Sequence, residues 1–523
     1  MAALLLIPGI IILAVLQYLV MPVYNFSFFQ IYILISIAIW LLGSMAIGQT
    51  KAGILAAAQL GTVIVAAILV STPIINASRY RNLIGEVKVK ELEKSLPPIK
   101  IDSAPLVSKH MAEQAAQKKL SNIPALGSQV VLGELVKQNI GGKLYWVSFL
   151  EHSGIFQWNN TGFTPGYVKV SATNVEDVEL VQEVGGKKLQ MRYLTSAYLG
   201  DYAERRIYGE VKTLGIVDFS PEVDDEGNPF IVASLIDKSV GFSGSDTVGV
   251  AVLNVQTGVV KIFKKDEVPT WIDRVHPEYI VYEQVNDWGN YVNGWFNPSN
   301  KDQLMVSDYI DLVYGEDGNC YFYLGITSVG KDNGIVGFIL VNSRTKETTL
   351  YYVAGANEEV AAKSAEDVMP EKKYHSTNPL PFSVNGVPTY IMTLTDQNGI
   401  PRAYAMVNIQ HYQVLAVADT LKNTYQLYLN KLAHGNRGNV SIDENKSSLT
   451  KVSGVIDRIA NDIKNGTTVY YLTLKNEDKI FSATSDLNEK LVLSKTGDTV
   501  EIQYEPSDLK IQTMNKFENR NVK

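Results

Sequence analysis

Candidate chemistry in this sequence is confined to a few clusters of acidic, aromatic and amide side chains. The 523 residues contain no Walker-type phosphate loop, no His-Glu-x-x-His zinc motif and no Gly-x-Ser-x-Gly nucleophile elbow. The stretch nearest to an elbow, Gly241 to Ser245, lacks the second glycine and is typical of a hairpin loop. The six histidines never stand four residues apart, and the single cysteine, Cys320, cannot form a disulfide within the chain. We therefore expect a protein that is not an enzyme.

An acidic turn offers the only weak candidates for metal ligands, Asp224, Asp225 and Glu226, which precede Gly227. Oxygen donors followed by glycine suit a hard cation such as calcium. The closing glutamate of a calcium-binding EF-hand loop is missing, and acidic residues before glycine also make hairpin turns without metal. We favour the hairpin turn, and we expect neither a metal nor a cofactor.

The densest aromatic and amide cluster, from Asp287 to Asn297, provides the candidate contact residues for a ligand or partner. These are Trp288, Tyr291, Trp295 and Asn297. Flat rings supply contact area and amides supply hydrogen bonds on a binding face. The competing interpretation, which we favour, is that the three aromatic residues pack one helix onto a sheet, because they are spaced three and four apart.

The N-terminal segment is almost free of charge. Within the first 78 residues only Lys51 is charged, whereas Arg79 and Arg81 follow at once. Because about 20 apolar residues cross a bilayer as a helix, three membrane helices are predicted, at about 3–23, 28–47 and 53–75. Two helices with one re-entrant or interfacial segment are the alternative.

The side of the membrane on which the large C-terminal part lies is weakly determined. The positive-inside rule places Lys51 in the cytoplasm, but Arg79, Arg81, Lys88 and Lys90 favour the opposite orientation. Short strands rich in tyrosine, asparagine, threonine and glycine favour an extracytoplasmic location. We therefore predict a multi-pass protein of the bacterial cell membrane with its C-terminal part outside.

The predicted fold class is α+β, with membrane helices, repeated helix-plus-antiparallel-sheet modules and a small C-terminal β-barrel. The predicted organisation is as follows: membrane region 1–78, linker 79–106, first to fourth modules 107–200, 201–270, 271–355 and 356–433, linker 434–450, barrel 451–510 and tail 511–523.

An internal repeat underlies the module prediction. Each copy has a turn glycine, then strands, then an asparagine, and the pairs are Gly227 with Asn254, Gly318 with Asn342 and Gly386 with Asn408. The separations are 27, 24 and 22 residues, and a looser copy runs from Gly142 to Ser171. Repeated sequence patterns of this kind indicate repeated supersecondary units.

Two segments resemble known folds. The stretch Glu358 to Asp419, a helix followed by an Asn-Gly-x-Pro-x-Tyr strand and a strand ending in a tight turn, resembles PepSY-type modules. That resemblance implies an extracytoplasmic or membrane-anchored bacterial protein with regulatory or protease-inhibitory units. The segment 451–510, with a Gly497-Asp498 turn before its final alternating strand, resembles a five-stranded barrel of OB type. The whole chain resembles large membrane-anchored proteins of bacteria and their mobile elements.

The function predicted from these features is that of a membrane-anchored, non-enzymatic scaffold or assembly protein that presents protein-binding modules. Expected partners are the lipid bilayer and other membrane or envelope proteins, and a homo-oligomer is compatible with the repeat. The net charge of −7 and strands without a basic stripe disfavour nucleic acid. The alternatives are a PepSY-like regulator or inhibitor of an extracytoplasmic peptidase, and a hydrolase whose site the sequence hides.

Overall fold

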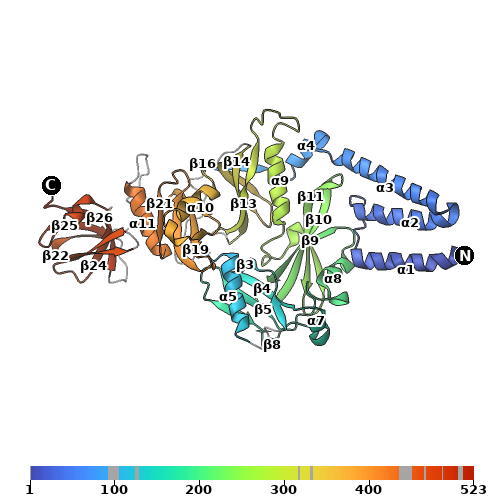
Figure 1. Ribbon diagram of the computed structural model, residues 1–523, viewed down its shortest axis with the longest axis horizontal. Helices are drawn as coiled ribbons and strands as arrows, with labels where there is room; N and C mark the ends of the chain where they lie inside the picture. The colour runs from blue at the N-terminus through green and yellow to red at the C-terminus, as the bar shows by residue number, and fades with distance from the viewer. Residues whose placement is uncertain are drawn as a thin grey trace.

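The computed structural model describes residues 2–91, 105–123, 129–315, 318–329, 334–434, 450–464, 467–485, 487–504 and 511–522. It is a mixed α+β protein in which N-terminal helices precede several antiparallel sheets (Figure 1). Part of the predicted linker 79–106, at 92–104, and most of the predicted linker 434–450, at 435–449, lie outside the described residues.

Three apolar helices open the chain: α1 (Ala2–Val20), α2 (Phe29–Ile47) and α3 (Gln49–Ser71). Gly48 separates α2 from α3 with a φ of 87°, a conformation that favours glycine. The short α4 (Pro73–Arg81) begins after Thr72, whose side chain accepts a hydrogen bond from the Ile74 amide. The third apolar run thus ends as a helix at Ser71, four residues before the predicted boundary.

Among the described residues, one helix, α3, is both long and apolar enough to cross a membrane. Helices α2 and α1 contribute shorter apolar stretches, Phe29–Ser44 and Ile10–Val20. By length and composition the structure therefore supports one crossing helix. The multi-pass arrangement with three crossings goes beyond this finding and stays a prediction.

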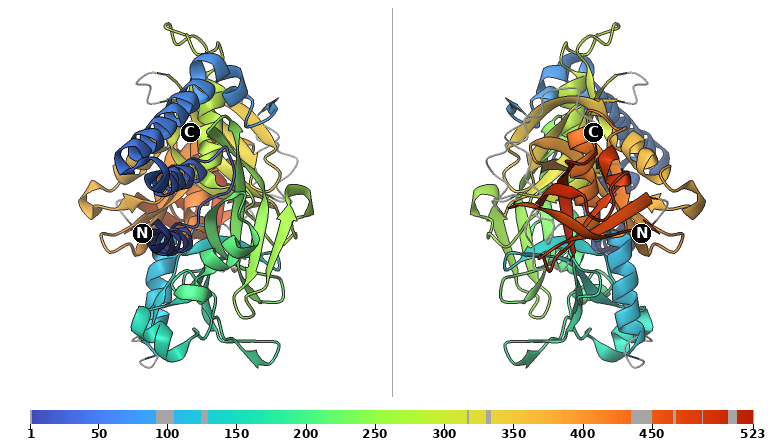
Figure 2. Two further views of the ribbon diagram at one scale, coloured as in Figure 1. Left: turned by 90° about the vertical axis from the view of Figure 1, so that its right-hand side faces the viewer. Right: turned by 90° about the vertical axis from the view of Figure 1, so that its left-hand side faces the viewer.

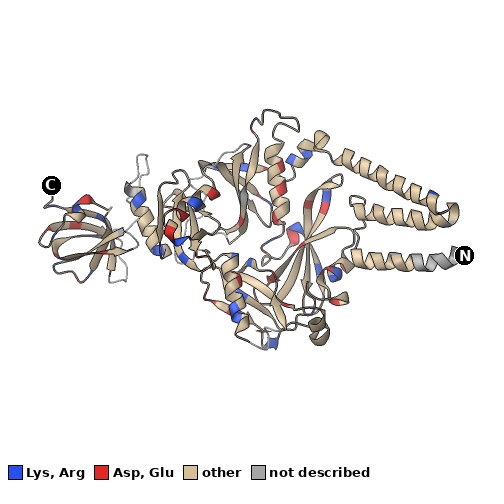
Figure 3. Ribbon diagram, viewed as in Figure 1, with Lys and Arg blue, Asp and Glu red and all other residues tan. Residues whose placement is uncertain are grey.

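Helices α2 and α3 form a closely packed hairpin (Figure 1). An added Cβ at Gly43 would lie 3.0 Å from the Cβ of Ala52, so the two backbones approach closely through small residues. Ser36 of α2 donates a hydrogen bond to Gln59 of α3, which gives both polar side chains a partner between the helices. Figure 3 shows how few charged residues these helices carry, and the one basic residue, Lys51, lies in the first turn of α3.

Four consecutive units follow, and in each a helix precedes a meander of antiparallel strands. In the first unit α5 (Lys109–Ser121) accompanies β2 (Val130–Leu132), β3 (Val136–Ile140), β4 (Lys143–His152), β5 (Tyr167–Ser171) and β6 (Val178–Val181). In the second, α8 (Ala203–Glu210) precedes β9 (Gly215–Val223), β10 (Pro229–Val240), β11 (Ser243–Asn254) and β12 (Val260–Lys264). Sequence reasoning missed α7 (Ile155–Thr161), the hairpin strands β7 (Glu183–Val184) and β8 (Lys187–Lys188), and the short helices η3 (Leu199–Asp201) and η4 (Lys265–Glu267).

The third and fourth units repeat the same plan. Helix α9 (Glu278–Asn290) precedes β13 (Leu304–Tyr314), β14 (Cys320–Ser328), β15 (Gly334–Asn342) and β16 (Thr348–Ala356). Helix α10 (Glu358–Glu366) and η5 (Pro370–Lys372) precede β17 (His375–Ser376), β18 (Leu380–Val384), β19 (Val387–Thr395), β20 (Pro401–Asn408) and β21 (Leu415–Ala418). Helix α11 (Leu421–His434) then packs on β20 and β21.

The repeated asparagine has a single structural role. The Oδ1 atoms of Asn254, Asn342 and Asn408 each accept hydrogen bonds from the amides two and three residues later, at distances of 2.8 to 3.0 Å. Ser171 does the same in the looser copy, through its hydroxyl, at 3.3 Å. Such turns let a short polar side chain bond the backbone at the strand end. The sequence repeat therefore marks the turn between the last two strands of each meander.

Part of the predicted linker 79–106 is not a linker but a strand of the third sheet. Strand β1 (Val87–Glu91) pairs in parallel with β16, with Val87 opposite Thr348, and so forms an edge of the third sheet. Its alternating Val-Lys-Val-Lys sequence is typical of an exposed edge strand, but the pairing partner lies far along the chain.

At the C-terminus the strands are β22 (Thr450–Lys464), β23 (Thr467–Leu474), β24 (Ile480–Thr484), β25 (Thr499–Tyr504) and β26 (Ile511–Asn519), with α12 (Glu489–Val492) after β24. They pair in the order β22-β23-β24-β26-β25, and β22 also pairs with β25. Strand β26 lies in the range predicted as a tail, so the strands continue past residue 510. Its buried Met514 and Phe517 stand three apart, because a register irregularity interrupts the alternation that would identify a strand.

The anchor helices and the first β-rich units are joined by hydrogen bonds from several segments. Tyr208 of α8 donates to the Pro22 carbonyl at 2.7 Å, and the Tyr24 amide donates to the Lys212 carbonyl at 2.7 Å. Arg79 donates to the Ser239 carbonyl at 2.6 Å. The helices lie at one end of the long axis and the C-terminal strands at the other (Figure 1), and Figure 2 views the molecule from each of these two ends. The turn between α2 and α3 lies at the end of these helices away from the sheets (Figure 1).

Candidate functional site

A cavity of about 530 Å³ lies where the first, third and fourth units meet. This junction cleft falls in the size range of small-ligand sites. Its lining residues are Pro105 to His110, Glu134 to Lys137, Trp146, Arg274, Glu278, Ile310 to Leu312, Ser376 to Asn378, Leu380 and Thr395. The junction cleft is therefore built by residues from three units of the chain.

Helix α5 presents its first turn to the junction cleft. Ser108 caps this helix, and its hydroxyl accepts a hydrogen bond from the Met111 amide at 3.3 Å. Lys109 and His110 of the same turn line the cleft. The partial positive charge of a helix N-terminus favours an acidic group there. Glu134 provides this acidic group, since its carboxylate forms a 3.2 Å ion pair with Lys109, and both residues line the cleft.

Lys137 is a buried cation on the wall of the junction cleft. Its Nζ atom lies 3.8 Å from Asp311 of β13, and it donates to the Leu312 carbonyl at 3.4 Å. The same atom lies 5.0 Å from the centre of the Trp146 ring, a cation–π contact. Lys137 thereby holds the first unit against the edge strand of the third.

Arg274 carries a second charge into the junction cleft. It donates to the Ser220 hydroxyl at 3.1 Å, while its Nε is shielded from solvent and has no hydrogen-bond partner among the described residues. Burial alone would lower the pKa of Arg274, but the carboxylate of Asp218 raises it. Arg274 is thus a permanent cation. Asp218 has a φ of 54°, a strained backbone conformation for a non-glycine residue.

Behind Arg274 lies a buried acidic pair, Glu222 and Asp273. Burial raises the pKa of Glu222 to about 8, with the nearby charge of Asp273 adding to the effect. Burial likewise raises the pKa of Asp273 to about 6, although Asp273 accepts hydrogen bonds from the Asn139 amide at 2.6 Å and the Tyr314 hydroxyl at 3.3 Å. Glu222 therefore remains protonated at neutral pH, so the protein does not bury a second negative charge beside Asp273.

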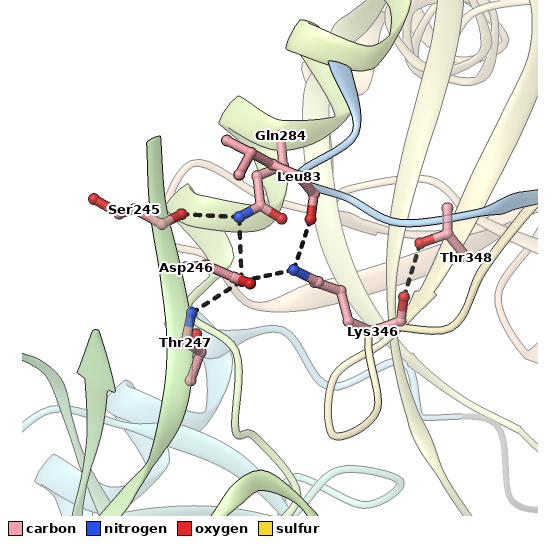
Figure 4. A network of polar contacts seen from close by, with 7 residues as sticks. All are labelled: Leu83, Ser245, Asp246, Thr247, Gln284, Lys346 and Thr348. Atoms are coloured by element: carbon pink, nitrogen blue, oxygen red, sulfur yellow. Dashed lines mark hydrogen bonds and ion pairs between the residues drawn. The ribbon is translucent and has the colours of Figure 1, made fainter. Parts of the chain in front are cut away.

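A polar network ties the second and third units to the segment that leaves the membrane helices (Figure 4). The Nζ atom of Lys346 lies 2.6 Å from Asp246 and donates to the Leu83 carbonyl at 2.7 Å. Gln284 of α9 donates to the Ser245 carbonyl at 2.9 Å. Burial alone would raise the pKa of Asp246, but Lys346 holds it below its ordinary value. Four segments distant in sequence are fixed to one another here.

The aromatic cluster predicted from the sequence divides into packed and exposed members. Trp288 lies half-buried in α9, 5.8 Å from the Arg81 guanidinium, and the rings of Tyr291 and Tyr80 lie 6.2 Å apart. Trp295 is half-exposed, and Asn297 accepts a hydrogen bond from the Lys301 amide and donates to its carbonyl. Two of the aromatic residues thus pack α9 against α4, and none of the four lines the junction cleft.

The acidic turn is engaged in its own hairpin. Asp224 Oδ1 accepts hydrogen bonds from the amides of Glu226 at 3.2 Å and Asn228 at 2.7 Å, and Asp225 accepts one from the Gly141 amide. Within the described ranges no group of three histidine, cysteine or acidic residues could hold a metal ion. As in many hairpins, the acidic oxygens here satisfy backbone donors.

Sequence reasoning missed the junction cleft and its charges. Glu222 stands just before the acidic turn at Asp224 and Arg274 directly after Asp273, and the alternation of Ser220 and Glu222 on β9 was the one available signal. That alternation points two polar side chains to the same face of a strand. Only the packing of the units shows that this face is buried.

The comparisons with known proteins add no family assignment. No family model matches the chain, and the search of curated proteins returned no match.

Proposed function

We propose that this protein is a membrane-anchored, non-enzymatic scaffold whose units bind another membrane or envelope protein, with the junction cleft as the contact site. The observation that carries the proposal is the union of an apolar helical anchor with a series of β-rich units through the hydrogen bonds at Tyr208, Tyr24 and Arg79. A tether of this kind positions the units at the membrane surface.

The exposed surface of the helices supports the anchor. Large apolar side chains along α1 to α3 face outward, among them Ile11, Leu42, Ile54 and Ile68. Contiguous apolar surface of this extent marks contact with a membrane or another protein. We infer that all three helices enter the bilayer, α3 along its whole length. In that arrangement Lys51 lies on the side opposite Arg79 and Arg81, and the units lie outside the cell.

The polar groups of the junction cleft support binding over catalysis. The four hydroxyl groups that line it, those of Ser108, Ser376, Thr377 and Thr395, are each hydrogen-bonded to backbone groups. The histidine of the cleft, His110, is hydrogen-bonded through its Nε2 to Gln114 at 3.0 Å, whereas nucleophilic catalysis requires a hydroxyl within reach of such a base. The cleft also carries charges of both signs, and Arg274 and Glu278 form no ion pair among the described residues. These charges suit a partner segment that has both acidic and basic side chains.

The finer fold assignments belong to the same proposal. The strand order β22-β23-β24-β26-β25, with β22 pairing at both ends and α12 between β24 and β25, supports an OB-type C-terminal barrel. The helix-plus-meander plan of the fourth unit supports its likeness to PepSY-type modules. Neither fold carries a function by itself.

The anchor and its sidedness are tested on the full chain in intact bacterial cells. We expect the protein to remain in the membrane pellet after alkaline extraction, and we expect protease added outside the cells to cleave the units. Release into the supernatant would contradict the anchor. Protection until lysis would place the units in the cytoplasm.

The binding role of the junction cleft is tested with a photoreactive amino acid at Glu278, which is exposed and lines the cleft. The matched control is Tyr279, which is also exposed but does not line the cleft. We expect irradiation of cells to yield one discrete protein adduct at Glu278, identified by mass spectrometry, and none at Tyr279. Equal adducts at both positions would remove the junction cleft from the proposal.

A further inference from the structure

An apolar patch on the first unit, which we call the α7 patch, is unusually exposed for a soluble domain. It consists of Ile155, Phe156, Phe163, Tyr198 and Leu199. Phe156 is 83% exposed and Leu199 is 61% exposed. Leu199 also has a φ of 53°, so a branched apolar side chain is held outward by a backbone conformation that costs free energy. A leucine at position 199 is therefore explained neither by burial of its side chain nor by the backbone conformation that leucine prefers.

A chain of contacts places the α7 patch beside the end of α1. The rings of Trp158 in α7 and Tyr198 lie 5.5 Å apart, which joins the two parts of the patch. The guanidinium of Arg205 donates to the Leu199 carbonyl at 2.8 Å and to the Tyr18 carbonyl at 3.3 Å. It also lies 4.0 Å from the centre of the Tyr18 ring. One side chain thus bridges the patch and the membrane helix.

The position of Tyr18 indicates where the α7 patch lies relative to the membrane surface. Tyr18 lies in the last turn of α1, which ends at Val20 on the side of the β-rich units. Tyrosine and arginine near a helix end are typical of the membrane–water interface. Figure 1 shows α7 and α8 at the end of the units nearest to α1. The α7 patch therefore lies at about the level at which α1 leaves the bilayer.

We propose that the α7 patch is a lipid-contact surface that inserts into the headgroup boundary of the leaflet from which α1 emerges. The proposal rests on the anchor described above, and it adds a second, peripheral contact that fixes the tilt of the first unit on the membrane. Phospholipid is the occupant that fits, because the patch is apolar and Arg205 joins it to the last turn of α1, a helix whose exposed side chains are themselves apolar. Interfacial apolar side chains of this kind enter the headgroup and acyl boundary without crossing it.

The test uses the full chain in phospholipid nanodiscs with single cysteines that carry an environment-sensitive fluorophore. Cys320 does not interfere, because it is buried. The test positions are Phe156→Cys and Leu199→Cys. Ile68→Cys in α3, 64% exposed, reports on the anchor, and Ile463→Cys, 73% exposed on β22 at the far end of the molecule, is the matched control.

We expect nitroxide-labelled lipid to lower the fluorescence at Phe156→Cys and Leu199→Cys about two-fold, because interfacial groups lie about 5–10 Å into the boundary. We expect no change at Ile463→Cys. Quenching at Ile68→Cys alone would overturn the lipid-contact patch and leave the anchor standing. The absence of quenching at Ile68→Cys as well as at both patch positions would overturn both. A blue-shifted emission at Phe156→Cys without quenching would show that protein covers the patch, as in contact with a second copy, and would also overturn the proposal.

Discussion

The ring of Phe242, at the tip of the β10–β11 hairpin, lies 4.8 Å from the ring of Phe29 at the start of α2. The Phe242 amide donates to the Ser71 hydroxyl at the end of α3, at 2.8 Å. One hairpin tip thus contacts both helices of the anchor hairpin. Gly241 allows this approach, since an added Cβ would lie 2.6 Å from the Ser71 hydroxyl.

Replacement of Phe242 by alanine should loosen this junction. Aromatic pairs contribute about 0.5–1.5 kcal/mol beyond the apolar area they bury, so we expect local opening to become easier by about 1–2 kcal/mol. Hydrogen exchange of the full chain in detergent should show faster exchange near Ser71 and Phe242. Phe296→Ala, at a ring that is 75% exposed, is the control and should leave that exchange unchanged. Unaltered exchange in Phe242→Ala would mean that the hairpin tip does not hold the anchor.

Replacement of Lys346 by methionine should destabilise the protein, because Asp246 keeps its charge in a partly buried site without its cation. Removal of one partner of such a pair costs about 2–4 kcal/mol. Asp246→Asn in the same background should recover part of the loss, and a double-mutant cycle from thermal unfolding gives the coupling free energy. A coupling near zero would show that the ion pair does not join the second and third units.

Glu222 should make the stability fall as the pH rises. An unfolded glutamate ionises near its ordinary pKa of 4.5, whereas folded Glu222 keeps its proton up to a pKa of about 8. Between these values the folded state binds more protons, so the free energy of unfolding decreases by up to about 1.4 kcal/mol per pH unit. Asp273, with its pKa raised to about 6, adds to the decrease below that pH.

Thermal unfolding measured at pH 5, 6.5 and 8 tests this dependence. In Glu222→Gln we expect the decrease above pH 6 to disappear, because the amide cannot ionise. Glu113→Gln, at an exposed position of α5, should retain the dependence of the parent protein. Stability that rises steadily with pH in the parent would contradict the burial of Glu222.

Cys320 should be unreactive in the folded protein. Its side chain is 1% exposed, and burial raises the pKa of its thiol to about 12. Because the thiolate is the reactive form, alkylation by iodoacetamide at pH 8 should be slow under native conditions. It should become complete after unfolding in guanidinium chloride. Rapid native labelling would show that β14 opens easily from the third sheet.

Several elements were predictable because their signals are local. The helix expected at the start of the stretch Glu358 to Asp419 appears as α10, and the Asn357 side chain caps it. The repeated glycine and asparagine marked the turns of the four meanders, because a positive φ and a side chain that bonds the next amides depend on neighbouring residues only. Strand β1 escaped prediction as part of a sheet, since its partner β16 is distant in sequence.

The sequence by itself determined the near absence of charge before Arg79, the α+β class and the turn of each repeat, because composition, periodicity and turn chemistry act over a few residues. The tertiary structure alone decided that Arg274, Glu222 and Asp273 share one buried site and that Trp288 packs on Arg81. It also decided that Arg205 joins Leu199 to Tyr18. These relations depend on how separate units pack, and burial and long-range contact have no signature within a single short stretch of chain.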